Sequence, residues 1–395
     1  MQVEGLKKVV RVAGGGLHNV TLDADGQVYS WGCNDDKCLG QTSEREWKFK
    51  RVAGFGDEEV IQVDGGDSHS ACVTSSGKVF SWGLYRDNEG AMRISEDEEF
   101  RNIPGEVEVA EEGTRFLRIA CGSNHTVGMT VDGDVYGWGC HTVGQVSLPP
   151  ASAQKGAVKK HLDSITWKNP RKPNCEASMI LAPLRMNLGL ILGKKKADQK
   201  VVLIASGSNH SFALTATGKV VCWGLNNEGQ LGLGDNETRD QPEVIEELSD
   251  KGVVQIAAGD SHTMVLTKTG SVFTFGEGLY GKLGHGEIYS PHTKERTCPR
   301  PKKVDYLEGR GVRQISCGGQ HSLAVTVTGK LYSWGQAGHF LGLGNEDDDV
   351  FSPSLIKAKT IRDKFVVHAD AGGQHSILVA TDMPIDVDSS KPLCM

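Results

Sequence analysis

A short motif recurs seven times along the chain and constrains its fold more than any other feature. The motif is G-x-x-H, followed by an apolar segment, a glycine turn and a segment of the form V/L-Y/F-S-W-G. Its histidines are His18, His69, His125, His210, His262, His321 and His375. Neighbouring histidines lie 51 to 59 residues apart, except for the interval of 85 residues from His125 to His210. A regular period with one long interval predicts a repeat architecture that carries a single insertion.

Each repeat has the pattern of short β-strands. In GKVVCWG and GKLYSWG, apolar residues alternate with small or polar ones between glycine turns. No helix-period stretch of useful length interrupts the repeats. Four short antiparallel strands repeated radially form the blades of a β-propeller, whose closure leaves few exposed sheet edges. We therefore predict an all-β, seven-bladed β-propeller with four-stranded antiparallel blades.

Two side chains of the repeat have predictable structural roles. The tryptophans of the W-G segments offer large apolar surfaces for packing between neighbouring blades. They are Trp31, Trp82, Trp138, Trp223 and Trp334, with Phe275 at the equivalent place in the fifth repeat. Seven histidines at equivalent strand starts are better explained by hydrogen bonds to the backbone than by seven active sites. The motif histidines are therefore predicted to be structural.

The long interval between the third and fourth motifs holds the insertion. The repeat breaks down from Ser147 to about Lys200. The first half of this stretch is basic, with Lys155, Lys159, Lys160, Lys168, Arg171 and Lys172. An insertion of this length in a compact repeat is either functional or disordered. The expected layout is a propeller over residues 1–382, an insertion at about 147–200 and a polar tail over 383–395.

The two ends of the repeat array bear on closure of the ring. The seventh motif, AGGQHSILVATD, has no W-G strand after it, and no strand ahead of the first motif replaces it. Either an N-terminal segment is missing or the last blade is incomplete. We favour a missing segment, because an open ring would expose sheet edges.

Composition narrows the classes of function. The net charge of −7 requires any nucleic-acid contact to come from a local basic patch. The chain has no apolar run of membrane-spanning length and no opening signal peptide, which predicts a soluble intracellular protein without a membrane partner. The ten cysteines include no C-x-x-C pair. No cluster of acid–base residues or metal ligands stands out, so we predict no metal, no cofactor and no small-molecule substrate.

The repeats resemble those of the regulator of chromosome condensation family, from about Val9 to Asp382. The shared features are G-x-x-H-(S/T), the glycine turn and Y-S-W-G-x-N-x-x-G-Q-L-G. This resemblance implies a seven-bladed propeller. The stretch VDGGDSHSACVTSSGKVFSWGLYRDNEG narrows it further, because it is similar to a segment of the chromatin-bound guanine nucleotide exchange factor for the small GTPase Ran. Here YRDNEG takes the place of the usual G-Q-L-G turn and occurs once.

The resemblance implies a set of GTPase-binding residues. In that family the Asp of GDSH and the loop containing R-D-N-x-G, called the β-wedge, contact the GTPase. The corresponding residues are Asp67, Tyr85, Arg86, Asp87, Asn88 and Gly90, together with Asn124, Asp260 and Ser261 of the third and fifth motifs. Two positions depart from the family, since Asn124 stands where it has Asp and Ser261 where it has His. The wedge is expected to displace the phosphate-binding region of the GTPase, with Asp67 pairing with a basic group. This exchange needs no catalytic residue, because no covalent bond changes.

The resemblance also implies a chromatin contact through the insertion. Family members carry a basic loop at this place, and Lys155, Lys159, Lys160, Arg171 and Lys172 would serve here to bind the nucleosome or histones in the nucleus. Lysine is a point charge, whereas arginine offers a bidentate fork, so this chain departs from the family's chemistry. A different class remains open, namely a propeller that binds partners without exchange activity. Arg86 and Asp87 also fit an ordinary surface pair. The unique YRDNEG segment favours the exchange factor.

Overall fold

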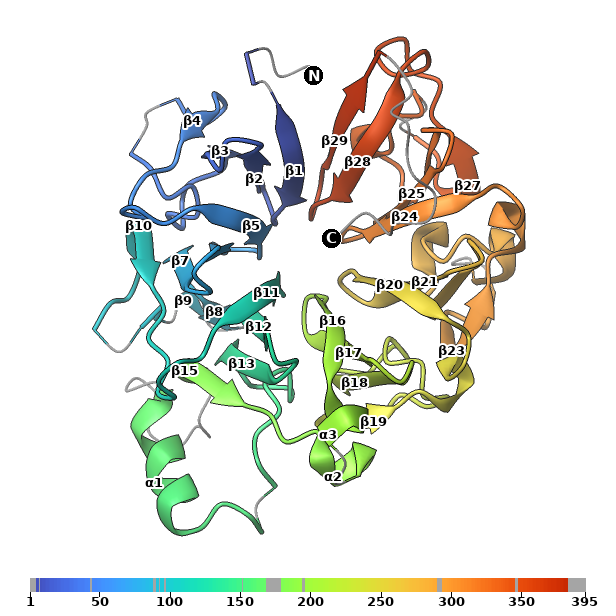
Figure 1. Ribbon diagram of the computed structural model, residues 1–395. Coiled ribbons are helices and arrows are strands. Elements are labelled where there is room, and N and C mark those ends of the chain that lie inside the picture. The colour runs from blue at the N-terminus through green and yellow to red at the C-terminus, as the bar shows by residue number, and fades with distance from the viewer. Residues whose placement is uncertain are drawn as a thin grey trace.

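The computed structural model describes residues 5–6, 8–42, 45–87, 90–91, 93–95, 97–150, 152–167, 179–193, 196–289, 293–344 and 347–382. It shows antiparallel sheets arranged radially about a common axis (Figure 1). Each strand-forming segment alternates inward and outward residues, and the glycine turns between them permit tight reversals. The first strand of each sheet lies nearest the axis, and later strands follow outward.

Blades 1 and 2 contain four strands each, in the orders β1-β2-β3-β4 and β10-β7-β6-β5. The strands of blade 1 are β1 (Val9–Gly14), β2 (His18–Asp23), β3 (Val28–Gly32) and β4 (Lys50–Arg51). Those of blade 2 are β5 (Val60–Gly65), β6 (His69–Thr74), β7 (Val79–Gly83) and β10 (Arg101–Glu106). Between β7 and β10, the strands β8 (Arg86–Asp87) and β9 (Gly90–Ala91) pair as a separate hairpin.

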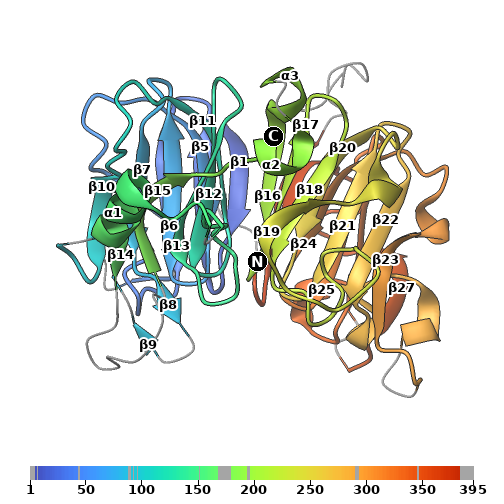
Figure 2. The same ribbon diagram turned by 90° about the horizontal axis from the view of Figure 1, so that it is seen from below.

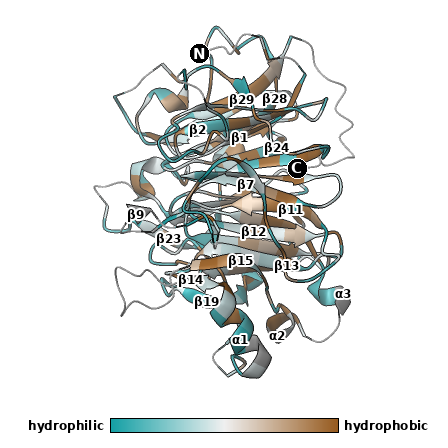
Figure 3. Ribbon diagram, turned by 90° about the vertical axis from the view of Figure 1, so that its left-hand side faces the viewer, coloured by the Kyte–Doolittle hydropathy of each residue, from teal (hydrophilic) through white to brown (hydrophobic). Residues whose placement is uncertain are grey.

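Blade 3 has five strands in the order β11-β12-β13-β15-β14. They are β11 (Phe116–Cys121), β12 (His125–Thr130), β13 (Val135–Cys140), β14 (Thr166–Trp167) and β15 (Met179–Arg185). The predicted insertion therefore supplies the outer strands of this blade. It also contains helices α1 (Gly156–Ile165), α2 (Gly189–Leu192) and α3 (Lys196–Gln199). Figure 3 shows that β11 and β15 are largely apolar whereas α1 is mainly hydrophilic.

Blades 4, 5 and 6 return to four strands in chain order. They comprise β16 (Val201–Ser206), β17 (His210–Thr215), β18 (Val220–Gly224) and β19 (Arg239–Val244); β20 (Val253–Ala258), β21 (His262–Thr267), β22 (Val272–Glu277) and β23 (Thr297–Lys303); and β24 (Val312–Cys317), β25 (His321–Thr326), β26 (Leu331–Gly335) and β27 (Val350–Leu355). Short 3-10 helices occupy their loops at Glu246–Leu248, Leu279–Gly281, Gly286–Tyr289, Asp305–Leu307 and His339–Leu341.

The prediction of seven four-stranded blades is wrong. Besides the β8–β9 hairpin, the described residues form a six-bladed β-propeller and one small sheet of two strands, β28 (Phe365–Ala371) and β29 (Ser376–Thr381). Among the described residues, the seventh motif provides only its first two strands, without the outer pair that the other blades have. β1 nevertheless contacts β28 and β29, and the two ends of the ring lie side by side (Figure 1). The Gly373 N–H donates to the Gly15 carbonyl at 3.0 Å across this junction.

The core lies between neighbouring blades. One cluster joins Val73, Val79 and Tyr85 of blade 2 to Phe116 and Trp138 of blade 3. Trp82, Trp138, Trp223 and Trp334 are fully or almost fully buried, as expected for packing between blades, whereas Trp31 is half-buried. A buried tryptophan also uses its polar edge, since Nε1 of Trp82 donates to the Cys38 carbonyl of blade 1 at 2.8 Å.

The motif histidines are structural, but their partner differs from the one predicted. In six of the seven, Nε2 lies within hydrogen-bond distance of a side-chain hydroxyl of the next blade rather than of the backbone. The pairs are His18–Ser70, His69–Thr126, His125–Ser211, His210–Thr263, His262–Ser322 and His321–Ser376, at 2.8 to 3.1 Å. At the last junction Asn19 stands in place of the hydroxyl residue, and Nε2 of His375 has no hydrogen-bond partner in the described part of the chain.

Candidate interaction face around the β8–β9 hairpin

The β8–β9 hairpin projects from one face of the propeller. Figure 2 shows it extending beyond the ends of the strands of blade 2. The loops between the first and second strands of each blade open on this same face, which we call the hairpin face. Asp67, Asn124, Asp260 and Ser261 all lie in these loops. The structure therefore brings the predicted residues of three motifs to one face.

Backbone hydrogen bonds link these loops into a rim. The Asp67 N–H donates to the Ser123 carbonyl at 3.0 Å, and the Ser123 N–H donates to the Ser208 carbonyl at 3.1 Å. The Ser208 N–H then donates to the Gly259 carbonyl at 3.0 Å. Because each loop is tied to its neighbour, the side chains on the rim are held in fixed relative positions.

Asp67 is exposed on this rim. Gly16 of blade 1 leaves room for it, since a Cβ at that position would lie 3.1 Å from Oδ1 of Asp67. Protein atoms crowd the carboxyl group on its inner side, and this desolvation raises the pKa of Asp67. A hydrogen bond with Ser123 opposes the rise, while the charge of Asp260 adds to it. Asp67 therefore gains from any basic group that a partner brings to the rim.

Asp260 occupies the equivalent place in blade 5 and is half-buried. Its Oδ1 accepts a hydrogen bond of 2.6 Å from Oγ of Ser208. A Cβ at Gly319 would lie 2.9 Å from its Oδ2, so glycine is needed beside this carboxylate too. Ser261 is half-buried, and its carbonyl accepts from the Glu277 N–H at 2.8 Å. The rim therefore carries two carboxylates from blades 2 and 5.

Tyr85, which was predicted to contact a partner, is buried in this structure. It is 1% exposed. Its hydroxyl lies 3.1 Å from Oγ1 of Thr126 in blade 3, and its ring centroid lies 4.5 Å from that of His69. Burial raises the pKa of Tyr85 well above its usual value. Tyr85 is thus the apolar anchor beneath the hairpin.

Arg86 begins the hairpin, and both its backbone and its side chain have partners. Its N–H donates to Oδ1 of Asn124 at 2.7 Å. Its guanidinium pairs with Asp36 of blade 1, with an Nε–Oδ2 distance of 2.9 Å. Asp36 is not among the residues predicted from the sequence. The sequence feature that could have indicated Asp36 is its position in the repeat. Asp36 follows the W-G of blade 1, and this segment lies beside the segment of blade 2 that bears YRDNEG.

The remaining predicted residues are only partly placed. Asp87 lies in β8 and Gly90 in β9, whereas Asn88, Arg171 and Lys172 fall outside the described residues. Lys155 precedes α1, and the exposed Lys159 and Lys160 lie on it, at the outer edge of blade 3. These lysines are therefore separate from the β8–β9 hairpin.

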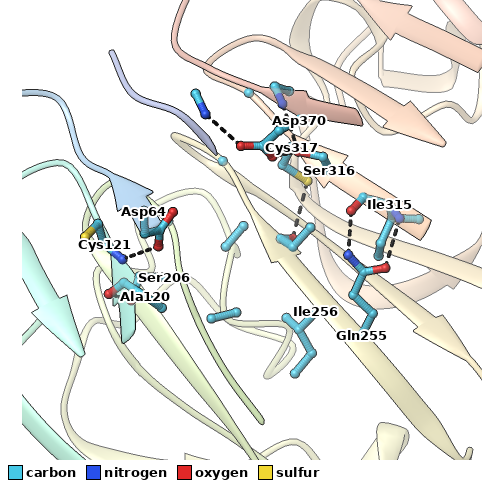
Figure 4. A pocket seen from close by; sticks show the side chains of 18 of the residues that line it. Asp64, Ala120, Cys121, Ser206, Gln255, Ile256, Ile315, Ser316, Cys317 and Asp370 are labelled. Carbon is cyan, nitrogen blue, oxygen red and sulfur yellow. Dashed lines mark hydrogen bonds between the residues drawn. The ribbon is translucent and has the colours of Figure 1, made fainter. Parts of the chain in front are cut away.

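A cavity of about 680 Å³ lies on the propeller axis and opens beside the rim. It is lined mainly by the first strands of the blades, and Figure 4 shows the carboxylates of Asp64 and Asp370 on its wall. Both carboxylates are occupied, since Asp64 accepts from the Cys121 N–H at 2.8 Å and Asp370 from the Gly14 N–H at 2.8 Å. Burial raises the pKa of Asp64 to about 6. These groups join neighbouring blades.

Chemistry at a metal or within a membrane finds no support in the part of the chain that the structure describes. Its His, Cys, Asp and Glu residues form no group that could hold a metal ion. None of its helices has the length and apolar character needed to cross a bilayer. The motif histidines are poor acid–base groups, because burial lowers the pKa of His69 and His125 to about 3.

Comparisons with known proteins agree with this architecture. Residues 1–378 match the RCC1-like domain model. The chain is 31% identical to the regulator of chromosome condensation of Homo sapiens over 382 residues, which cover 95% of this chain and 83% of that protein. The crystal structure of Prp20p from Saccharomyces cerevisiae, studied for its binding to Gsp1p and histones, has a TM-score of 0.79 at 27% identity and covers 97% of this chain and 84% of its own. The chain also matches a small part of the E3 ubiquitin-protein ligase HERC2 of Homo sapiens. The identity is 31%, and the match covers 89% of this chain and 6% of HERC2.

Proposed function

The chain belongs to the family of proteins with an RCC1-like domain, and on that basis we propose that it is a guanine nucleotide exchange factor for the small GTPase Ran, acting on chromatin in the nucleus. The observation that carries this proposal is the β8–β9 hairpin, which projects beside a rim bearing Asp67 and Asp260. Every other blade continues from its third strand without such a hairpin among the described residues. The likeness to Prp20p, which was studied for binding to Gsp1p and histones, supports the same partners.

The proposed mechanism is thermodynamic linkage. An exchange factor binds the nucleotide-free GTPase more tightly than the loaded one, and by reciprocity it lowers the affinity for nucleotide. Accelerating release by about 10⁵ requires about 7 kcal/mol of preferential stabilisation of the open state. One contact cannot supply that amount, whereas a broad face with a projecting hairpin can. The hairpin would displace the phosphate-binding region, and Asp67 would pair with a basic group there.

The test is release of a fluorescent guanine nucleotide from Ran, with catalytic amounts of this protein and excess unlabelled nucleotide. Asp67→Ala should lower kcat/KM by about tenfold or more, since it removes an exposed charge made for the partner. Asp132→Ala is the matched control, because it removes an exposed acid from the turn between β12 and β13 on the opposite face. Equal activity of the two variants would remove Asp67 from the mechanism.

A second candidate function is a propeller that binds partners without exchange activity. It is favoured by the likeness to a small part of HERC2, a protein named for a different activity. A folded chain that leaves the nucleotide release rate of Ran unchanged would support this candidate. Replacing Asp87 and Asn88 together by Ala separates the two functions, because only an exchange factor that works through the hairpin loses activity.

A further inference from the structure

Asp36 of blade 1 receives three hydrogen bonds that meet at the base of the β8–β9 hairpin. Nε of Arg86 donates to its Oδ2 at 2.9 Å, and a second guanidinium nitrogen donates to Oδ1. Oγ of Ser68 donates to Oδ2 at 2.7 Å. Two parallel bonds between Arg and a carboxylate fix orientation as well as distance. Burial tends to raise the pKa of Asp36, but these hydrogen bonds outweigh it and leave the pKa below its usual value.

The opposite side of the same residue is held by blade 3. The Arg86 N–H donates a hydrogen bond to Oδ1 of Asn124, and the hydroxyl of the preceding Tyr85 is hydrogen-bonded to Oγ1 of Thr126. The hairpin base is therefore clamped between two neighbouring blades, by Asp36 on one side and by Asn124 on the other. The Asp36 side chain is 19% exposed and that of Arg86 is 43% exposed, so the pair lies at the surface.

We propose that Asp36 is a positioning residue that sets the direction in which the β8–β9 hairpin projects. In this proposal Arg86 acts by donating its hydrogen bonds to Asp36 rather than by contacting the partner. This proposal rests on the proposed function for its effect on exchange. A surface ion pair contributes only about 0–1 kcal/mol to global stability, so its role here is local orientation. The pair also cancels the charge of Arg86, which leaves the rim acidic.

Four variants test the proposal in the full chain. Asp36→Ala removes the clamp, Arg86→Ala removes its other half, and the double variant removes both. Asp35→Ala is the matched control, because it removes a neighbouring exposed charge, whereas the guanidinium of Arg86 donates to Asp36. Nucleotide release from Ran gives kcat and KM, and hydrogen–deuterium exchange reports the Arg86 amide without requiring activity.

Asp36→Ala is expected to lower kcat about tenfold with KM changed by less than about twofold, because the hairpin loses its direction while the rim still binds. The Arg86 amide should exchange faster, and the double variant should be no worse than either single one. Asp35→Ala should match the wild type. Additive losses, or unchanged amide exchange in Asp36→Ala, would overturn the clamp.

The two proposals fail in different ways. A wild-type chain that does not accelerate release contradicts the proposed function, and amide exchange then still decides whether Asp36 holds the hairpin. An active wild type with an equally active Asp36→Ala contradicts the positioning role alone.

Discussion

Oδ1 of Asn124 accepts a hydrogen bond of 2.7 Å from the backbone N–H of Arg86. The loop of blade 3 therefore holds the segment that leaves blade 2, and this contact needs only an oxygen acceptor. An aspartate would serve equally well as an acceptor and would add a negative charge to the rim. Asn124 is thus compatible with the hairpin geometry, and it makes the hairpin face less negative than an aspartate would.

Asn124→Asp should strengthen the encounter with a basic partner. We expect KM for Ran to fall about threefold at low ionic strength, with kcat unchanged, because rim charges mainly change association. The effect should vanish at high salt. Exchange assays at two ionic strengths measure it, and Ser75→Asp, in the turn between β6 and β7, is the control. A salt-independent change, or the same change in the control, would contradict this account.

Tyr85 should matter for stability more than for partner contact. Tyr85→Phe removes only the hydroxyl that meets Thr126 and should lower the free energy of unfolding by about 1 kcal/mol while exchange stays near the wild-type rate. Tyr85→Ala should cost about 3–5 kcal/mol, because it leaves a cavity between two blades. Thermal unfolding and nucleotide release measure both effects. A stable Tyr85→Phe variant with lost exchange would show that the hydroxyl reaches the partner.

His125→Gln should destabilise the propeller without abolishing exchange. Nε2 of His125 lies 2.8 Å from Oγ of Ser211, in a fully buried junction between blades 3 and 4. Loss of this bond is expected to cost about 1–3 kcal/mol, seen as a lower melting temperature. His161→Gln, on α1, is the control. Lost exchange in a stable His125→Gln chain would refute a purely structural role.

Stability should fall on acidification because of the buried histidines. Burial lowers the pKa of His18, His69, His125, His210 and His321 to about 3, against 6.5 when unfolded. Between these values the unfolded chain binds more protons, so each histidine removes up to about 1.4 kcal/mol per pH unit as pH drops below 6.5.

Carboxylic acids whose pKa is raised by burial act in the other direction, namely Asp64, Asp67 and Asp370. Asp64, with its pKa raised to about 6, favours the folded state as pH falls through that range. The five histidines are expected to outweigh these acids, so melting temperatures measured from pH 8 to pH 4 should be constant above about 6.5 and fall below. A melting temperature that stays flat or rises on acidification would refute this balance.

The basic helix should affect chromatin binding and leave exchange intact. Replacing Lys159 and Lys160 by Glu should weaken nucleosome binding about tenfold, because both are exposed on α1 away from the hairpin. Lys251→Glu with Lys268→Glu changes the net charge equally outside the insertion. Gel-shift titration with nucleosomes measures binding. Equal losses in the two pairs would indicate a general charge effect rather than a site.

Much of the architecture could be predicted from local patterns. Alternation and glycine turns placed the strands, and the seven G-x-x-H motifs placed the loops that carry Asp67, Asn124 and Asp260. The break from G-Q-L-G to YRDNEG located the hairpin. These features are properties of short segments, since period-two alternation and turn chemistry act over a few residues.

The features that could not be predicted from the sequence share a cause. The hydroxyl partners of the histidines, the burial of Tyr85 and the clamp between Asp36 and Arg86 all join residues of neighbouring blades. Such contacts lie about 40 to 90 residues apart in sequence, and no local pattern records them. The last sheet has two strands, and the W-G strand missing after the seventh motif leaves an incomplete last blade open as an alternative to a missing segment.

Local periodicity alone shows that the chain forms radial sheets and that one repeat differs from the rest. Which side chains remain available to a partner follows instead from how the blades pack against one another. Tyr85 is buried and Arg86 is occupied by Asp36, whereas Asp67 stays exposed on the rim. Whether a side chain is available to a partner depends on which residues of the neighbouring blade contact it, and closure of the ring sets which blades are neighbours.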